Sequence, residues 1–181
     1  MAETFERIDE KHADFIKNQH VFFVASAAAD GHVNLSPKGL DCFRVLGPNQ
    51  VAYLDVTGST NETAAHMLAD GRITFLFTSF TRNPLNLRIY GKGHIVRPDS
   101  PEFEELAKHF PSHPGTRQFI VADIHKVTTN CGYSIPEMEL VRERPTLGKW
   151  AEAKGEDGII EYQKKNNTRS MDGLPTGIEA D

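Results

Sequence analysis

The segment at residues 58–61, Gly-Ser-Thr-Asn, has the residue types that bind a phosphate group. It follows an alternating run, 51–56, that is rich in β-forming residues, and it precedes apolar residues with helical spacing over 64–68. The order strand, turn, helix places this turn at a helix N-terminus, where free N–H groups and the helix dipole attract anions. Ser59 and Glu62 also fit a capping box, which needs no ligand, and Glu62 would itself oppose a phosphate. The turn alone therefore leaves a ligand site and a simple helix cap open as alternatives.

A second polar segment, Ser36-Pro37-Lys38-Gly39, follows the strand expected at 32–37. A lysine beside a hydroxyl and a glycine can bind a phosphate or the edge of a flavin. The alternative is an ordinary turn with a solvated lysine, and the segment alone favours that alternative.

Two further polar side chains, Asn86 and Arg88, lie on one face of a long expected strand at 85–96. Each is either a surface residue or an anion ligand.

The histidines form no recognisable site, since Pro111 would end the helix between His109 and His113. Cys131 beside Gly132 could be a nucleophile, although a buried, inert cysteine is the commoner case.

Composition excludes several classes of protein. A chain of 181 residues, 39% hydrophobic and 25% charged, is long enough for a sizeable core without disulfides or metals. A net charge of -5 argues against nonspecific nucleic-acid binding, so any phosphate must be met by local cations. Two distant cysteines and a charged, amphipathic start favour a reduced, cytoplasmic protein, and no apolar run has the ~20 residues that span a bilayer. The cysteine and histidine spacing gives no zinc site.

The elements that must position these residues are mostly strands. The pattern predicts a helix over 4–18 and then six strands, at 21–27, 32–37, 50–56, 72–80, 85–96 and 119–129. A helix is expected to begin near Asn61, and another to begin after Ser100-Pro101 and to run to about His109. Short strands joined by turns, with helices added, favour a mainly β fold, an antiparallel barrel with flanking helices.

The C-terminal part of the chain reads differently. Two short helices are expected at 147–154 and 156–165, followed by a polar, irregular end that we interpret as an arm or a loose tail. We therefore expect a barrel domain over 1–140 and a helical extension with a tail over 141–181.

In order and spacing, these segments resemble the pyridoxamine 5′-phosphate oxidase-like family of FMN-binding split barrels. The resemblance rests on VFFVASA…DGHVNLSPKG, VAYLDVTGSTNET, RITFLFTSF, LRIYGKG, NCGYSIP and DGLP, which together cover most of the chain. It implies an antiparallel split β-barrel that forms a homodimer with FMN at the interface. The residues it assigns to the cofactor are Ser36, Pro37, Lys38, Gly39, Ser59, Thr60, Asn61, Asn86 and Arg88, the last two reaching the flavin either from the same chain or from the partner chain.

The chain departs from the oxidase branch of that family in two places. Thr60-Asn61 stands where that branch has an Arg-Lys pair, and the end, DGLPTGIEAD, lacks the arginines that meet the substrate phosphate. We therefore expect pyridoxamine phosphate to be a poor substrate. Lys38, Arg88 and Arg117 are the candidates to replace the missing cations.

Two functions stay open at this point. The first is an FMN-dependent oxidoreductase that acts on an unknown small substrate, with no identified catalytic residue and no metal. The second is a flavin- or haem-binding carrier or sensor without turnover, and a deazaflavin or haem could also replace FMN. No nucleic-acid or membrane partner is expected.

Overall fold

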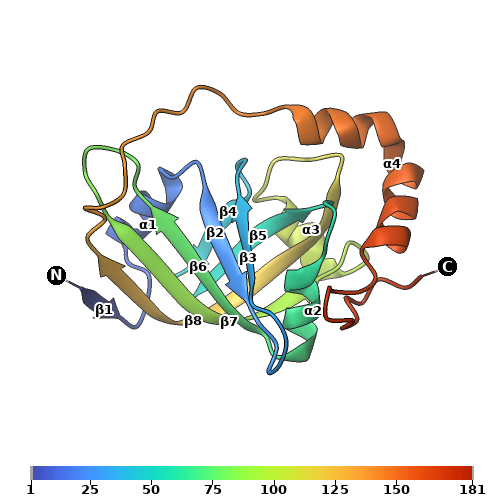
Figure 1. Ribbon diagram of the computed structural model, residues 1–181, viewed down its shortest axis with the longest axis horizontal. Coiled ribbons are helices and arrows are strands. Elements are labelled where there is room, and N and C mark those ends of the chain that lie inside the picture. Colours follow the sequence, from blue (N-terminus) through green and yellow to red (C-terminus); the bar gives the residue numbers. More distant parts are fainter. Residues whose placement is uncertain (1, 181) are drawn as a thin grey trace.

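The computed structural model describes residues 2–180, which form one eight-stranded sheet and four helices (Figure 1). The strands are β1 (Glu3–Phe5), β2 (Phe22–Ser26), β3 (Asn34–Lys38), β4 (Phe43–Gly47), β5 (Gln50–Val56), β6 (Arg72–Thr78), β7 (Asn86–Val96) and β8 (Thr116–Asn130). The helices are α1 (Glu10–Lys17), α2 (Glu62–Ala69), α3 (Pro101–Ala107) and α4 (Thr146–Asn166).

The sheet is antiparallel throughout and curls without closing. Its strand order is β3-β2-β6-β7-β8-β5-β4, and β1 pairs with β8 outside this path. No ladder within residues 2–180 joins the edge strands β3 and β4, so the barrel is split at that side. This arrangement confirms the predicted antiparallel split β-barrel with flanking helices.

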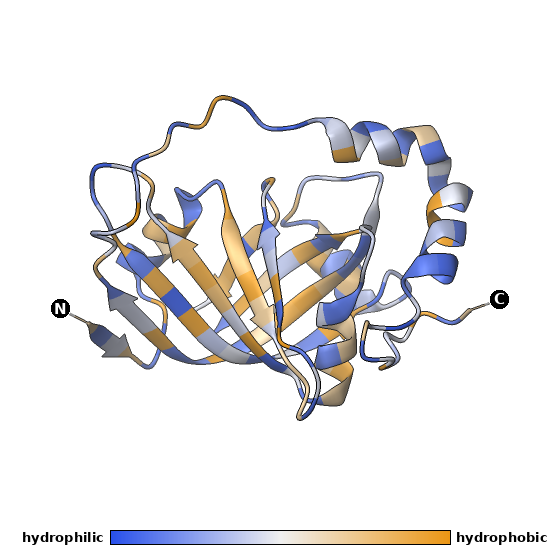
Figure 2. Ribbon diagram, viewed as in Figure 1, coloured by the Kyte–Doolittle hydropathy of each residue, from blue (hydrophilic) through white to orange (hydrophobic). Residues whose placement is uncertain are grey.

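The concave face of the sheet holds the core. On β2, Phe22 and Val24 are buried and lie opposite Phe77 and Phe75 of β6, and the apolar colour of these strands is visible in Figure 2. The rings of Phe22, Phe77 and Phe43 have centroids 4.9–5.2 Å apart. Phe43 belongs to β4, so this cluster packs β4 against β2 and β6 across the open side of the barrel. Burial of each such side chain contributes about 1.5–3 kcal/mol.

Strand register assigns the predicted site residues of the sheet to two faces. Ser36 and Lys38 lie opposite Val24 and Phe22 and therefore share the inner face with the core. Pro37, Phe23, Leu76 and Arg88 form one row across β3, β2, β6 and β7 on the outer face.

The prediction of one helix over 4–18 was wrong at its start. Residues Glu3–Phe5 form β1, and α1 begins only at Glu10. The cause is a capping box in which Asp9 Oδ1 accepts the His12 N–H at 2.8 Å and His12 Nδ1 accepts the Asp9 N–H at 3.3 Å. A histidine in this role does not have the usual S-x-x-E signature.

The expected count of six strands was also too low, because β1 and β4 were missed. β4 is half-buried at every position and has a register irregularity between Val45 and Gly47, so it shows no clear alternation. By contrast, Ser100 caps α3 as predicted, with Pro101 in its first turn. The two helices expected at 147–154 and 156–165 are the two arms of α4, which kinks at Gly155, where φ is 69°.

The C-terminal end is irregular as expected, but it is packed and not loose. Asn167, Ser170 and Thr176 are buried, and Arg169 forms an isolated bridge with Pro175. In Figure 1 this segment lies beside α2, at the foot of α4. The division of the chain at residue 140 stays a prediction. In residues 2–180, no helix is both long and apolar enough to cross a membrane.

Candidate functional site

The turn at residues 58–61 leads from β5 into α2, as the sequence predicted. Ser59 and Thr60 are exposed, whereas Asn61, the N-cap of α2, is buried. Within the described chain no side chain caps this helix, so the capping box that Ser59 and Glu62 offered as an alternative does not form. The Glu62 carboxylate instead accepts the Met171 N–H, at 3.1 and 3.2 Å.

Asp55, at the end of β5, gathers the positive charges near this turn. Its side chain is 3% exposed, and its Oδ2 accepts hydrogen bonds from Arg117 Nε at 3.0 Å and Nη2 at 2.8 Å. Lys38 Nζ lies 3.2 Å from Asp55 Oδ1, and Gln118 Nε2 donates to Oδ2 at 2.8 Å. Burial alone would raise the pKa of Asp55, but Arg117 and Lys38 hold it at about 2.

This cluster joins the two predicted phosphate segments. Lys38 comes from β3 at one edge of the split sheet and Asp55 from β5 near the other, so their ion pair bridges the open side. Arg117 then reaches the turn, where its Nη1 donates to the Thr60 carbonyl at 3.0 Å. Two cations share one buried carboxylate, so the three side chains carry a net positive charge beside the turn.

Ser36 belongs to a neighbouring polar chain under α2. Its Oγ donates to Asn34 Oδ1 at 3.0 Å, and Asn34 Nδ2 donates to Thr63 Oγ1 and Ser26 Oγ, both at 3.2 Å. Ser26 Oγ lies 3.0 Å from Nδ1 of His66, a buried residue of α2. The inner face of β3 is therefore tied to the helix that carries the turn.

The outer-face residues are separate from this cluster. Arg88 Nη1 donates to Asn130 Oδ1 at 2.7 Å, and Asn86 Nδ2 donates to the Cys131 carbonyl at 3.4 Å. Since Arg88 shares the outer face with Pro37 and the inner face holds Lys38, one chain does not bring all nine predicted residues to one point.

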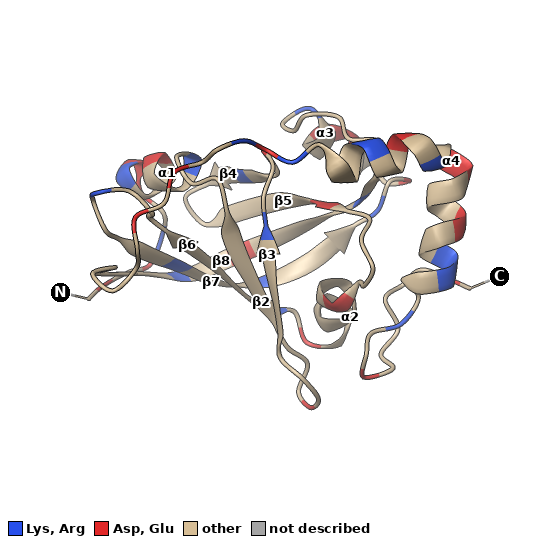
Figure 3. Ribbon diagram, turned by 45° about the horizontal axis from the view of Figure 1, so that its top comes forward, with Lys and Arg blue, Asp and Glu red and all other residues tan. Residues whose placement is uncertain are grey.

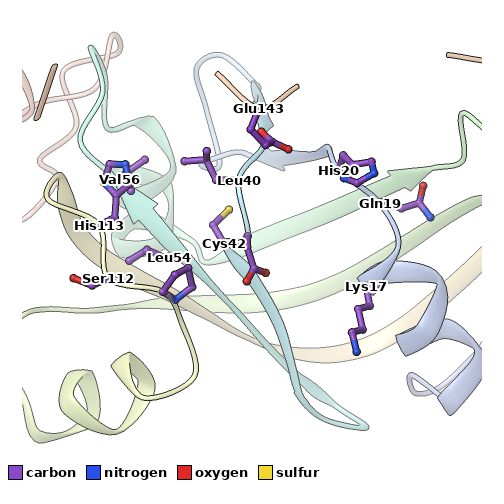
Figure 4. Close-up of a pocket in the computed structure, with 12 residues that line it drawn as sticks. Lys17, Gln19, His20, Leu40, Cys42, Leu54, Val56, Ser112, His113 and Glu143 are labelled. Carbon is purple, nitrogen blue, oxygen red and sulfur yellow. The ribbon is translucent and has the colours of Figure 1, made fainter. Parts of the chain in front are cut away.

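A cavity of about 420 Å³ opens directly after Gly39, at Leu40. Figure 4 shows Leu40 and Cys42 at its centre, His113 on one side and Lys17 and His20 on the other. Leu40 has a φ of 65°, a left-handed conformation that is uncommon for a leucine. The volume lies within the ~300–1,000 Å³ of small-molecule sites.

Two titratable groups of this cavity are shifted by burial. Burial raises the pKa of the Cys42 thiol to about 12, and its Sγ donates to the Gly39 carbonyl at 3.1 Å. Cys42 is therefore a thiol at neutral pH and not a nucleophile. Burial also lowers the pKa of His113, whose Nδ1 accepts the Gly115 N–H at 3.0 Å, so a neutral ring carries its proton on Nε2.

Charge elsewhere on the molecule is mixed. Figure 3 shows Lys and Arg interspersed with Asp and Glu along α1 and α4, so the binding of an anion would depend on the local cluster around Asp55.

Cys131, the other free cysteine, is exposed, contrary to the commoner buried case. Across residues 2–180, no group of three His, Cys, Asp or Glu side chains is placed to hold a metal ion.

Sequence reasoning missed three residues that organise this site, namely Asp55, Gln118 and Asn167. Asp55 had a readable signal, because it is the only charged residue of an otherwise apolar strand, VAYLDV. Asn167 had none, since it lies in the segment that we interpreted as a loose tail. Its Oδ1 accepts from Arg117 Nη1 at 2.7 Å.

The fold and the segments match known proteins. The family model described as Pyridoxamine 5'-phosphate oxidase matches residues 8–131. The "Pyridoxamine 5'-phosphate oxidase family protein ustO" of Aspergillus flavus is 38% identical over 189 aligned positions, which cover 94% of this chain and 76% of that protein.

Solved structures share the fold at low identity. A crystal structure of tagged HupZ from Group A Streptococcus has a TM-score of 0.54 and 21% identity, covering 66% of this chain and 91% of that one. A Lactobacillus delbrueckii structure, whose description names a pyridoxamine 5'-phosphate oxidase, has a TM-score of 0.53 and 18% identity, covering 68% and 94%. The family match and the fungal relative together carry the assignment, and the chain belongs to the pyridoxamine 5'-phosphate oxidase family.

Proposed function

We propose that this protein is a flavoprotein that binds FMN and carries out redox chemistry on a small organic substrate. One observation carries the proposal: the turn at residues 58–61 exposes two hydroxyl residues at an uncapped helix N-terminus, beside a buried cluster of net positive charge. Membership of the family supports it independently. The flavin would supply the electron-transfer chemistry, and the protein would bind and orient it.

The residues of the turn fit a phosphate group. Ser59 and Thr60 offer hydroxyl donors, and the first N–H groups of α2 point along the helix axis toward the same place. Glu62, which would repel an anion, is engaged by the Met171 N–H. Asn61 also has a partner inside the protein, because its Oδ1 accepts from Gln118 Nε2 at 2.9 Å.

We place the flavin ring along Ser36–Gly39, with Asn86 and Arg88 supplied by the partner of a homodimer. Asn86 and Arg88 lie on the outer face of the sheet, which supports this arrangement. A second copy could pack on that face, whereas Asn86 and Arg88 of the same chain could not reach around the sheet to its inner face. The row of Pro37, Phe23 and Leu76 on that face, with Leu35 66% exposed nearby, is suited to burial between two copies.

The substrate would enter the cavity that begins at Leu40, next to the proposed ring position. Its walls are apolar at Leu40, Leu54 and Val56, and the rest of its lining is mostly polar or charged, with Lys17, His20 and His113 among the hydrogen-bonding groups. We expect a small molecule with an apolar part and polar groups. Pyridoxamine phosphate should be a poor substrate, since no arginine lines this cavity among the described residues.

The test is a titration of purified protein with FMN, followed by flavin fluorescence and by the visible spectrum. We expect binding without added metal, reduction of the bound flavin by NADH or NADPH, and reoxidation by oxygen or a dye. A protein that does not bind FMN would contradict the proposal. A protein that binds FMN but is never reduced would favour a carrier or sensor.

A further inference from the structure

The C-terminal loop, residues 167–176, folds back onto the turn that we assign to phosphate. The loop closes on itself, because Thr176 Oγ1 donates to the Asn167 carbonyl and the Thr176 N–H donates to the Thr168 carbonyl at 3.1 Å. Asn167 and Thr176 are fully buried. In Figure 1 the loop lies beside α2, and its Met171 N–H contacts Glu62 in the first turn of that helix.

The two side-chain hydrogen bonds of Asn167 join it to the turn at residues 58–61 and to Arg117, the cation next to that turn. Its Nδ2 donates to the Gly58 carbonyl at 3.1 Å, from 109 positions away in the chain. Its Oδ1 accepts from Arg117 Nη1 at 2.7 Å. The same Nη1 donates to the Thr60 carbonyl, so one guanidinium is held between the loop and the turn.

These bonds fix the direction in which the turn faces. The carbonyls of Gly58 and Thr60 both accept hydrogen bonds from buried donors, while the Ser59 and Thr60 side chains are exposed. A turn whose acceptors are held inward presents its donors outward, which is the arrangement that an anion requires. The loop also engages Glu62 through the Met171 N–H and so reduces the repulsion from that carboxylate.

We infer that Asn167 is a positioning residue for phosphate recognition: from the C-terminal loop, it orients the turn at residues 58–61 and holds Arg117 behind it. This inference rests on the proposed function and adds the part of the chain that prepares the site. Asn167 is buried and does not touch the phosphate itself.

The experiment compares FMN with riboflavin, which has the same ring system but lacks the phosphate. Both are titrated into wild type, Asn167→Ala and Asn166→Ala, with circular dichroism as a check on folding. Asn166 is the matched control, because its side chain is exposed and, among residues 2–180, its Nδ2 donates to the Tyr162 carbonyl within α4. We expect Asn167→Ala to lower FMN affinity about tenfold, as for a lost hydrogen bond to a charged group, and to leave riboflavin affinity unchanged. Asn166→Ala should change neither.

Each outcome is decisive. An unchanged ratio of FMN to riboflavin affinity in Asn167→Ala, or an equal loss of both, would overturn the inference while leaving flavin binding intact. Wild-type protein that binds both flavins equally well would overturn it too, and protein that binds neither would overturn the proposed function with it. If Asn167→Ala does not fold, Thr176→Val loosens the loop and keeps the Asn167 side chain; a lowered ratio would support the inference and an unchanged ratio would overturn it.

Discussion

Asp55 is the residue on which the charges of the candidate site converge. It is buried, it accepts hydrogen bonds from Arg117 and Gln118, and it pairs with Lys38 across the split in the barrel. A buried carboxylate with two cationic partners holds both of them in place. If it were removed, two cations would lose their shared counter-charge in a poorly hydrated site.

We therefore expect Asp55→Asn to lower the free energy of unfolding by about 3–5 kcal/mol, the range for breaking a buried ion pair. The matched control is Asp123→Asn, whose carboxylate accepts a hydrogen bond from Gln50 at the surface of β8. It should change stability by no more than ~0.5 kcal/mol. Urea unfolding followed by circular dichroism measures both, and equal effects of the two substitutions would contradict the role of Asp55.

The same carboxylate predicts a dependence of stability on pH. The pKa of Asp55 is lowered from 3.8 to about 2 in the folded protein, so its contribution is present above pH 4 and is lost as the pH falls toward 2. That shift corresponds to roughly 2 kcal/mol. Unfolding curves between pH 6 and pH 2 should therefore show a smaller acid loss in Asp55→Asn than in wild type. Identical acid losses would show that Asp55 does not titrate in this way.

We propose Lys38 as the cation that shifts from Asp55 to a bound phosphate, because its side chain is 22% exposed whereas that of Arg117 is 4% exposed. Lys38→Ala should weaken FMN binding by roughly 1.5–3 kcal/mol, the range for a hydrogen bond to a charged group. Riboflavin binding should weaken less than FMN binding, because Lys38 lies along the proposed ring position but riboflavin has no phosphate for it to meet. Lys38→Arg should be milder but not neutral, since a planar guanidinium does not replace a point charge.

Lys92→Ala is the control for this titration, because Lys92 is an exposed lysine paired with Asp70 at the opposite end of the sheet. It should leave FMN affinity unchanged at fixed salt. If Lys38→Ala folds and binds FMN as wild type does, the phosphate is held without this lysine.

At the scale of single elements, β7 and β8 form the longest ladder of the barrel, and their register shifts between Tyr90 and Gly91. An ideal Cβ at Gly91 would lie 2.5 Å from the Asp123 carbonyl oxygen, so the two backbones approach closely only because this residue is glycine. The bulge bends β7 and helps the sheet to curl.

Gly91→Ala should lower the free energy of unfolding by about 1–3 kcal/mol, since the clash is with backbone and cannot be relieved by a side-chain rotation. Gly47→Ala is the control, because an added Cβ there has no described atom within 4 Å. Thermal unfolding followed by circular dichroism compares the two. A Gly91→Ala protein as stable as Gly47→Ala would show that the ladder adapts at the bulge.

At the scale of the whole molecule, α2 meets β2, β6 and β7 and α3 meets β8 (Figure 1). His66 of α2 contacts Ser26 on the inner face of β2, so α2 does not cover the outer face of β3, β2 and β6. Leu35 is 66% exposed on this face, and Val33, just before β3, is 72% exposed. The proposed homodimer would bury these side chains and bring Asn86 and Arg88 of one copy to the flavin of the other.

Leu35→Glu should therefore shift the protein from dimer to monomer in light scattering at micromolar concentration and weaken FMN binding at the same time, because a charge would be buried at the contact. Val141→Glu is the control, since Val141 is 91% exposed and belongs to the segment between β8 and α4, outside the three strands of this face. It should leave both properties unchanged. A wild-type monomer with flavin bound would contradict the dimer.

Local sequence determined much of the secondary structure. Ser100-Pro101 begins α3 and Gly155 divides α4, because caps and glycine act within one helical turn. The strands with clear alternation were predicted for the same reason. β1 and β4 were not, because β1 is held by its long-range pairing with β8 and β4 by its packing against Phe22 and Phe77.

The sequence by itself also identified Lys38 and the turn at residues 58–61 as candidates for phosphate, since residue type and local order are enough for that. Only the tertiary structure joined them, through Asp55 and Arg117, and placed Arg88 on the opposite face of the sheet. It alone brought Asn167 to Gly58, from 109 positions away. Contacts at such separations depend on how the sheet curls and how the chain end packs, and no local pattern of residues encodes them.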